Sequence, residues 1–538
     1  MRREIRLISA CAAFVCMGNA PARAADTSDT ACRTTAECQA QVERIKGGAI
    51  SDATSTQSKA QDFFYWVGRI NMASTVANVE RGIIPAPLAG KIAAGVAHSI
   101  DQAGKPGGRR PTDVLQIEKI ITDQAGPEAT LIHSGRSRQD IHATLYTAQL
   151  RTELLDFNDA LNEVRTRLLA SAAKNVDTFV PAYTNGVQAM PISYAHYLLA
   201  FADSFGRDAE RLRQVYARVN RSALGTAVLS NSSWPLDRQR LASLLGFDGL
   251  LVNSLDAGQI STYDIPIEAA NLAGSSAIRV GAFMQDVHVQ YHQVRPWLLL
   301  APDKTYTSSA MPQKANPGII QNTRGKASDV VGAAQMVTLR AHNVSPGMTD
   351  YKNAWSPAGA KTFVQAVDMM KQFADVLDAL RTDPRRSLEE LDAEWTTSME
   401  LAETLQRTSQ IPFRVGHHFA SEIVIYARAQ NLKPMEFPYA DAVRIYAEAG
   451  KKFQLTELKL PLDEATFRKA LSAENMVRTR VGTGGPQPEE VQRMLTEANA
   501  LLAQDMVWAK ERRAKLAQAD ASLDQAFFDL IKRQATRH

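Results

Sequence analysis

Apolar residues recur at steps of three and four along most of the chain from about residue 57 onward. This spacing places one apolar stripe along an α-helix, and such a stripe is the face that packs against a neighbour. The stretch 363–380 shows the pattern, and the longer segments 141–180, 192–220, 265–292 and 318–339 repeat it. Long helices in this number predict an all-α fold built around a helical bundle.

Glycine and proline residues separate the helical segments and predict the joints between them. Breaks are expected at 104–111, 180–191, 301–317 and 482–488. An amphipathic helix is expected over 489–514. The last residues, 515–538, are expected to form an exposed helix or a frayed tail.

Residues 1–24 have the pattern of a secretory signal peptide. A basic start precedes an apolar run over 7–17, and a small-x-small triplet follows at 22–24. A membrane anchor is the alternative, but the apolar run is too short to cross a bilayer. We therefore expect cleavage after Ala24 and a periplasmic or secreted protein with no membrane partner.

Two of the four cysteines leave with the signal peptide, and the mature chain keeps Cys32 and Cys38. They lie in an N-terminal extension over 25–56. An oxidising compartment would allow a disulfide between them. A redox or metal pair is the weaker alternative, because the sequence has neither CxxC spacing nor histidines nearby.

Charge and motif content exclude several classes of function. The chain of 538 residues has 61 basic and 57 acidic residues, a formal charge of +4. Four arginines against one glutamate put +3 into residues 1–24, which leaves the mature chain near +1 and without the charge of a nucleic-acid-binding protein. Zinc-protease, nucleophile-elbow, P-loop and dinucleotide motifs do not occur in the sequence, so no metal or cofactor is predicted.

Two irregular stretches carry groups that bind carboxylates. The segment 134–140 opens a helix, and its arginines add to the positive end of the helix dipole, although a solvated helix cap is the simpler interpretation. The loop 305–317 is more specific, because Ser308, Lys314 and Asn316 can surround one carboxylate with a hydroxyl, a cation and an amide. Such a loop suits proton abstraction next to a carboxylate, with serine as the base.

The loop Ser-Ser-Ala-Met-Pro-Gln-Lys-Ala-Asn-Pro at 308–317 resembles the G-S-S-x-M-P-x-K-x-N-P segment of the fumarase/aspartase superfamily. Residues 133–140 resemble the H-T-G-R-S-R-N-D segment of argininosuccinate lyase. Shorter pieces match in the same order, so that the resemblance covers roughly residues 60 to 510.

The resemblance implies an all-α, three-domain fold with a long central helical bundle, assembled as a homotetramer whose active sites each draw on three subunits. We place an N-terminal helical domain at 57–140, the bundle at 141–395 and a C-terminal helical domain at 396–514, ahead of the tail. The implied reaction eliminates fumarate from a succinyl adduct by breaking a C–N or C–O bond. The expected partner is therefore a small polycarboxylate substrate.

Site residues follow from the matching positions. The resemblance makes Ser308 the catalytic base and makes Lys314 and Asn316 its carboxylate-binding partners. The positions that it assigns to substrate binding are Asn71, Ser137, Arg138, Gln139, Thr184, Asn185 and Gln321.

Departures from the family pattern bear on the substrate. Asn185 and Gln321 replace a histidine and the glutamate that pairs with it, and two neutral amides can still hydrogen-bond each other. We interpret them as an active site retuned as a unit. Residues 346–350 replace the Y-N-R-D segment that holds the arginine-like half of argininosuccinate, which favours another substrate. A muconate-type cycloisomerase and a non-catalytic carboxylate-binding homologue are the alternatives.

Overall fold

The computed structural model describes residues 61–105, 108 and 110–535. The expected signal peptide, the extension over 25–56 and the Cys32–Cys38 disulfide lie outside the described residues. No described helix is long and apolar enough to cross a membrane.

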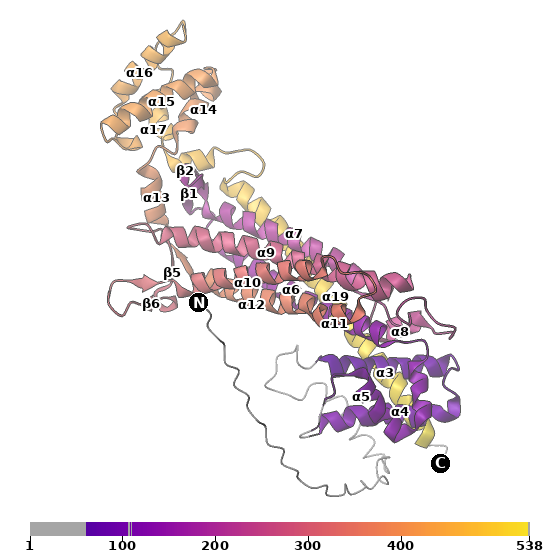
Figure 1. The fold of residues 1–538 in the computed structure, drawn as a ribbon. Coiled ribbons are helices and arrows are strands. Elements are labelled where there is room, and N and C mark those ends of the chain that lie inside the picture. Colours follow the sequence, from indigo (N-terminus) through magenta and orange to yellow (C-terminus); the bar gives the residue numbers. More distant parts are fainter. Residues whose placement is uncertain (1–60, 106–107, 109, 536–538) are drawn as a thin grey trace, which may run out of the picture.

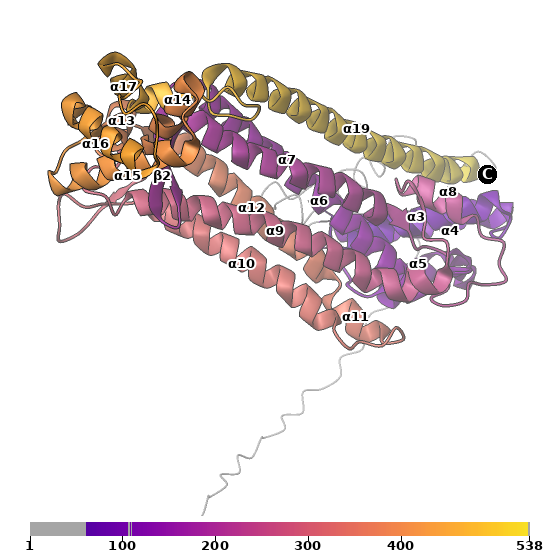
Figure 2. The same ribbon diagram turned by 90° about the horizontal axis from the view of Figure 1, so that it is seen from above.

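Five long helices run side by side and form the body of the molecule (Figures 1 and 2). They are α6 (Arg138–Lys174), α7 (Tyr194–Val219), α9 (Ser261–Gln290), α10 (Gly318–Ala341) and α12 (Pro357–Ala379). Their apolar stripes meet in one large core that includes Phe157, Phe283 and Phe363. The prediction of an all-α fold around a helical bundle is confirmed.

Smaller groups of helices cover the two ends of the bundle (Figure 1). At one end lie α3 (Phe63–Glu80), α4 (Ala86–Gly104), α5 (Val114–Ala125), η1 (Pro127–His133), α8 (Arg238–Leu244), the π-helix η2 (Asp256–Ile260) and α11 (Thr349–Trp355). At the other end lie α13 (Pro384–Asp392), α14 (Ser398–Ser409), α15 (Phe413–Ala429), η4 (Pro434–Glu436), α16 (Tyr439–Lys452), α17 (Glu464–Ala470) and α18 (Ala473–Arg478). Each end has a separate apolar core.

Short strand pairs occupy several of the expected breaks. An antiparallel hairpin joins β1 (Phe179–Thr184) to β2 (Val187–Ser193), and a shorter one joins β6 (Tyr306–Thr307) to β7 (Ala315–Asn316). The other pairs are β3 (Arg221–Ser222) with β4 (Gly249–Leu250) and β5 (Leu298–Leu300) with β8 (Leu380–Thr382), and the 3₁₀ turn η3 (Pro302–Lys304) follows β5. Helical periodicity stops at these places because the chain turns there.

Of the two forms expected for the C-terminal residues, an exposed helix or a frayed tail, the described part is a helix, but this helix is partly buried. Residues 515–535 continue α19 (Pro488–Ala535), which runs along the outside of the bundle to the N-terminal helices (Figure 2). Leu523 and Phe527 are fully buried there, in the core that α3 and α4 share. Their four-residue spacing continues the apolar stripe of the preceding helix, so that burial of these side chains makes the end of the chain part of the fold.

Candidate active site

The start of α6 is held in place by a buried carboxylate. Asp140 is fully buried, and its Oδ1 accepts a hydrogen bond from the backbone N–H of Ser137 at 2.8 Å. Its Oδ2 accepts three more, from the N–H groups of Gly225, Thr226 and Ala227 at 2.9–3.1 Å. Burial raises the pKa of Asp140 to about 6, while these donors and the charge of Arg136 oppose the shift. The carboxylate therefore fixes the helix start against a loop 85 residues away in sequence.

Arg136 ties the same loop to α3. Its guanidinium donates to Asn71 Oδ1 at 3.2 Å and to Ser74 Oγ at 2.7 Å, and burial lowers its pKa to about 10. The structure thus brings Asn71 to the segment that contains Ser137. The sequence analysis did not place Arg136 among the candidate residues, although its arginine-rich motif contains it.

His133 supports Arg136 from the other side. Its Nδ1 lies 3.4 Å from Arg136 Nη2, and its Nε2 lies 3.3 Å from Glu118 Oε2. Burial and the charge of Arg136 lower the pKa of His133 to about 4. At neutral pH the ring is uncharged, and the tautomer protonated at Nε2 satisfies both neighbours: it donates to Glu118 and accepts from Arg136.

The side chains of the first two residues of α6, Arg138 and Gln139, differ in exposure. Arg138 is exposed, and its Nη2 lies 3.7 Å from Asp350 Oδ1. Gln139 is buried and donates from Nε2 to the Gly258 carbonyl at 3.2 Å, while its Oε1 has no hydrogen-bond partner. The segment that departs from the Y-N-R-D pattern therefore packs beside the helix start within one chain.

A buried lysine fastens that segment to the π-helix η2. Lys352 is fully buried, and its Nζ donates to the Gln259 carbonyl at 2.6 Å and to Gln259 Oε1 at 3.2 Å. Burial lowers the pKa of Lys352 to about 8. Gln259 follows directly after Gly258, so Lys352 and Gln139 are both anchored to one turn of the chain.

The β6–β7 loop places a hydroxyl, a cation and an amide on one short, open hairpin. Ser308 Oγ accepts hydrogen bonds from the backbone N–H groups of Ala310 and Met311 at 3.3 and 3.2 Å. Lys314 is exposed, and Asn316 donates from Nδ2 to the Tyr306 carbonyl at 3.1 Å. Two N–H donors that point at one hydroxyl oxygen stabilise negative charge on it, which is what a serine base requires.

Asn185 has a conformational role in the β1–β2 hairpin. Thr184 pairs with Val187, so the turn has two residues, Asn185 and Gly186, with φ angles of 52° and 77°. Positive φ at both positions defines a type I′ turn, for which Asn-Gly is the favoured sequence. The dipeptide could have predicted this hairpin from sequence. The turn conformation thus gives a second reason for asparagine at position 185, where the family has histidine.

The structure does not bring all predicted site residues together within one chain. Ser137 lies at the start of α6, and β1 follows the end of this 37-residue helix, a helical length of about 55 Å. The two hairpins, with Thr184, Asn185 and the residues of the 308–316 loop, therefore lie at the opposite end of the bundle from Ser137 (Figure 1).

Gln321 does not meet Asn185 within one chain. Gln321 is exposed in the first turns of α10, and within the described part of one chain no hydrogen bond joins it to Asn185. Over the same residues, no group of three or more His, Cys, Asp or Glu side chains could hold a metal ion.

Comparison with known proteins places the chain in a family. A model described as Lyase matches residues 107–332, and a model described as Argininosuccinate lyase C-terminal matches residues 395–478. Argininosuccinate lyase from Methanoculleus marisnigri is 30% identical over 408 residues, which cover 75% of this chain and 79% of that protein. The enzyme from Methanosarcina barkeri is 29% identical over 470 residues, covering 86% and 91%.

Solved structures agree with this placement. EDDS lyase in complex with formate matches with a TM-score of 0.79 and 25% identity, over 92% of this chain and 96% of that one. The 3-carboxy-cis,cis-muconate lactonizing enzyme from Pseudomonas putida has a TM-score of 0.62 at 16% identity, over 82% and 96%, and shares the fold alone. The fold is that of the fumarase/aspartase superfamily. Within it, the chain belongs to the argininosuccinate lyase family and is a carbon–nitrogen lyase of this type.

Proposed function

We propose that this lyase eliminates fumarate from an amino-linked succinate and that Ser308 is the base. The observation that carries the proposal is the β6–β7 loop, where Ser308 Oγ accepts two backbone N–H groups and Lys314 and Asn316 lie within eight residues of it. The ionised oxygen takes a proton from the carbon next to a substrate carboxylate. The electron pair left behind forms the C=C bond as the C–N bond breaks, and the product is fumarate.

The neutral amides at 185 and 321 favour a leaving group that needs no acid. Asparagine and glutamine do not titrate near neutrality, so neither can give a proton to a departing nitrogen. A basic amine linked to succinate is already protonated at neutral pH and departs with its own proton. Nitrogen-linked succinates are therefore preferred over oxygen-linked ones. The replacement of the Y-N-R-D segment at 346–350, together with a similarity to EDDS lyase, favours an amine adduct over argininosuccinate.

The first experiment is an assay of fumarate release by purified mature protein, followed by ultraviolet absorbance. The panel contains EDDS, other N-substituted aspartates, argininosuccinate, malate and carboxymuconates, with Ser308→Ala as the control. We expect serine-dependent fumarate from an N-substituted aspartate. Consumption of carboxymuconate without fumarate would point to a cycloisomerase, and binding without turnover would point to a non-catalytic homologue.

A homotetramer with shared sites is the assembly that we propose. Ser137 and Ser308 lie at opposite ends of the bundle, so one chain cannot surround a small substrate with both, whereas neighbouring copies can. Two inactive variants, Arg138→Met and Ser308→Ala, should then restore activity when their subunits are mixed. When the two variants are mixed equally and their subunits assort at random, about a quarter of the sites receive both intact regions, so about a quarter of wild-type activity is expected. Verified hybrid oligomers that stay inactive would contradict shared sites.

Residues 1–24 have the pattern of a secretory signal peptide. We propose that the signal peptide is cleaved after Ala24 and that the lyase works in the periplasm or outside the cell. N-terminal sequencing of the protein recovered from fractionated cells checks this, with Ala25 expected as the first residue. An intact Met1 in the cytoplasmic fraction would contradict it.

A further inference from the structure

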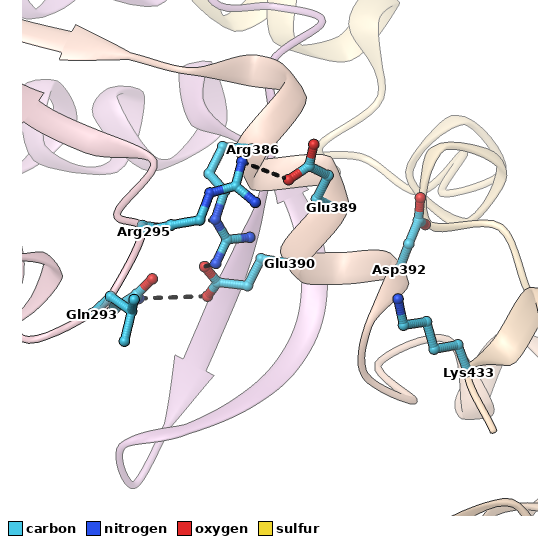
Figure 3. A pocket seen from close by; sticks show the side chains of 8 residues that line it. Gln293, Arg295, Arg386, Glu389, Glu390, Asp392 and Lys433 are labelled. Atoms are coloured by element: carbon cyan, nitrogen blue, oxygen red, sulfur yellow. Dashed lines mark hydrogen bonds and ion pairs between the residues drawn. The ribbon is translucent and has the colours of Figure 1, made fainter. Parts of the chain in front are cut away.

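A buried carboxylate on α13 lies against the β1–β2 hairpin close to its turn. Glu390 is 8% exposed, and its Oε1 accepts hydrogen bonds from Tyr183 Oη at 2.9 Å and from Gln188 Nε2 at 2.6 Å. Arg386 Nη2 lies 3.4 Å from the other carboxylate oxygen. Figure 3 shows Glu390 beside Arg386 and Gln293 in the pocket that α13 forms with the end of α9.

The two donors stand on opposite strands of the hairpin. Tyr183 and Gln188 are paired in register, directly before the Thr184–Val187 turn pair, and the register shifts between Ala182 and Tyr183. Such an irregularity leaves the orientation of the turn less well determined by the ladder of backbone hydrogen bonds alone. One carboxylate oxygen that binds both strands supplies the missing restraint.

The two hydrogen bonds to Glu390 meet at one carboxylate oxygen, 2.9 Å from Tyr183 Oη and 2.6 Å from Gln188 Nε2. Burial and the neighbouring Glu390 carboxylate raise the pKa of Tyr183, so its hydroxyl keeps the proton that it donates. Removing this carboxylate would leave the Tyr183 hydroxyl and the partly buried Gln188 amide without their acceptor.

We propose that Glu390 is a positioning residue that holds the tip of the β1–β2 hairpin, and with it Thr184, in the orientation needed to bind substrate. The inference rests on the proposed function, because it takes Thr184 as a substrate contact. Tyr183 directly precedes Thr184, so a shift of the tyrosine would displace the threonine. A displacement of about 1 Å in a substrate-binding group can lower the rate by about 100-fold.

The adjacent residue of α13 offers a matched control. Glu389 has the same side chain, and its carboxylate pairs with Arg295 at 3.2 Å and with Arg385 at 3.5 Å. Among the described residues it makes no hydrogen bond or ion pair to the hairpin. Exposed ion pairs of this kind contribute little to stability. Its removal therefore tests the loss of a glutamate from α13 without the loss of the hairpin restraint.

The experiment compares Glu390→Ala, Glu390→Gln and Glu389→Ala in the full-length oligomer. Steady-state rates are measured with the N-substituted aspartate that turns over fastest, fumarate affinity by titration calorimetry, and stability by urea unfolding. We expect Glu390→Ala to lower kcat/KM and weaken fumarate binding about 10- to 100-fold. Glu390→Gln should recover most of the loss, because an amide oxygen still accepts from Tyr183 and Gln188. Glu389→Ala should stay within about twofold of wild type.

Three further variants separate the possible failures. Thr184→Val tests the proposed function itself: if it leaves kcat/KM unchanged, the hairpin is not at the site. If Thr184→Val lowers kcat/KM but Glu390→Ala only lowers stability, the positioning role is wrong and the proposed function stands. If Glu390→Ala does not fold, the double variant Gln188→Glu/Glu390→Gln takes its place, because it exchanges the two side chains and keeps a carboxylate–amide contact. We expect the double variant to have a higher kcat/KM than Gln188→Glu alone. No rescue would overturn the proposal.

Discussion

The two ends of the helical bundle hold candidate site residues in opposite ways. At the start of α6, the buried Asp140 and the partly buried Arg136 make six hydrogen bonds of 3.2 Å or less to backbone and side-chain groups. At the other end, Lys314 is exposed, and Ser308 Oγ accepts two bonds, of 3.2 and 3.3 Å, from backbone groups of its own loop. The buried end is pre-organised by folding, whereas the open loop can change without affecting the fold. Substitutions should therefore separate stability from chemistry.

The largest effect is expected at the open loop. Ser308→Ala removes the proposed base and should lower kcat by about 10²- to 10⁴-fold. The free energy of unfolding should change by less than about 0.5 kcal/mol, because the side chain makes no tertiary contact that folding needs. Fumarate-release assays and urea unfolding measure the two quantities. Ser309→Ala, next to it on the same loop, is the control and should keep most of the activity.

A large loss of stability is expected where α19 covers the N-terminal helices. Phe527→Ala deletes a fully buried ring and should lower the free energy of unfolding by about 3–5 kcal/mol. Val507→Ala, at a position of the same helix that is 56% exposed, should change it by less than about 0.5 kcal/mol. Equal effects of the two substitutions in urea unfolding would mean that residues 515–535 are the exposed tail after all.

Acid should lower the free energy of unfolding through His133, which lies beside Arg136 near the start of α6. Its pKa is about 4 in the folded protein and about 6.5 in the unfolded chain, so the unfolded chain takes up a proton first as the pH falls. The contribution of His133 to the free energy of unfolding is fully present above pH 6.5 and is lost as the pH falls toward 4. We expect the loss to be about 1–3 kcal/mol, because the nearby Glu118 opposes part of the pKa shift.

Comparison of wild type with His133→Asn isolates this contribution. Asp140 has a raised pKa and acts with the opposite sign between pH 6 and 4, but it is present in both proteins and cancels in the difference. Urea unfolding at pH 7.5 and pH 4.5 should show wild type losing more stability than the variant. Equal losses of stability in the two proteins would show that burial does not lower the pKa of His133 as the structure indicates.

The smallest effect is expected at the hairpin turn. Asn185→Ala places a side chain that disfavours positive φ into the left-handed region and should cost about 1 kcal/mol of stability, whereas Asn185→Gly should be close to neutral. Thermal or urea unfolding of the two variants checks the difference. If alanine and glycine behave alike, the turn conformation does not explain asparagine at this position.

Regular periodicity predicted the long helices well, and irregular joints were harder to predict. The apolar stripe over 363–380 corresponds to α12 (Pro357–Ala379), and the motif at 308–317 led to the family that the comparisons confirm. The β1–β2 hairpin was missed although Asn185 and Gly186 are a strong turn signal, because the segment was interpreted only as a break between helices. The burial of the end of α19 was missed, although Leu523 and Phe527 continue the apolar stripe of this helix.

Contacts between distant residues could not be predicted from any local pattern. Nothing in the sequence around Tyr183 indicates that Glu390, 207 residues later, accepts its hydrogen bond. Likewise, the arginines of 134–140 suggested anion binding, but only packing showed that Arg136 donates to Asn71 and Ser74 on α3.

The sequence by itself determined the helical fold class, the family and the chemical groups of the β6–β7 loop, since periodicity, turn preference and side-chain chemistry depend on residues a few positions apart. The tertiary structure alone decided which candidates meet: Asn71 joins the start of α6, and Ser308 lies at the other end of the bundle. The reason is that burial and hydrogen bonding select among distant partners only when helices pack, and the length of α6 then sets the separation.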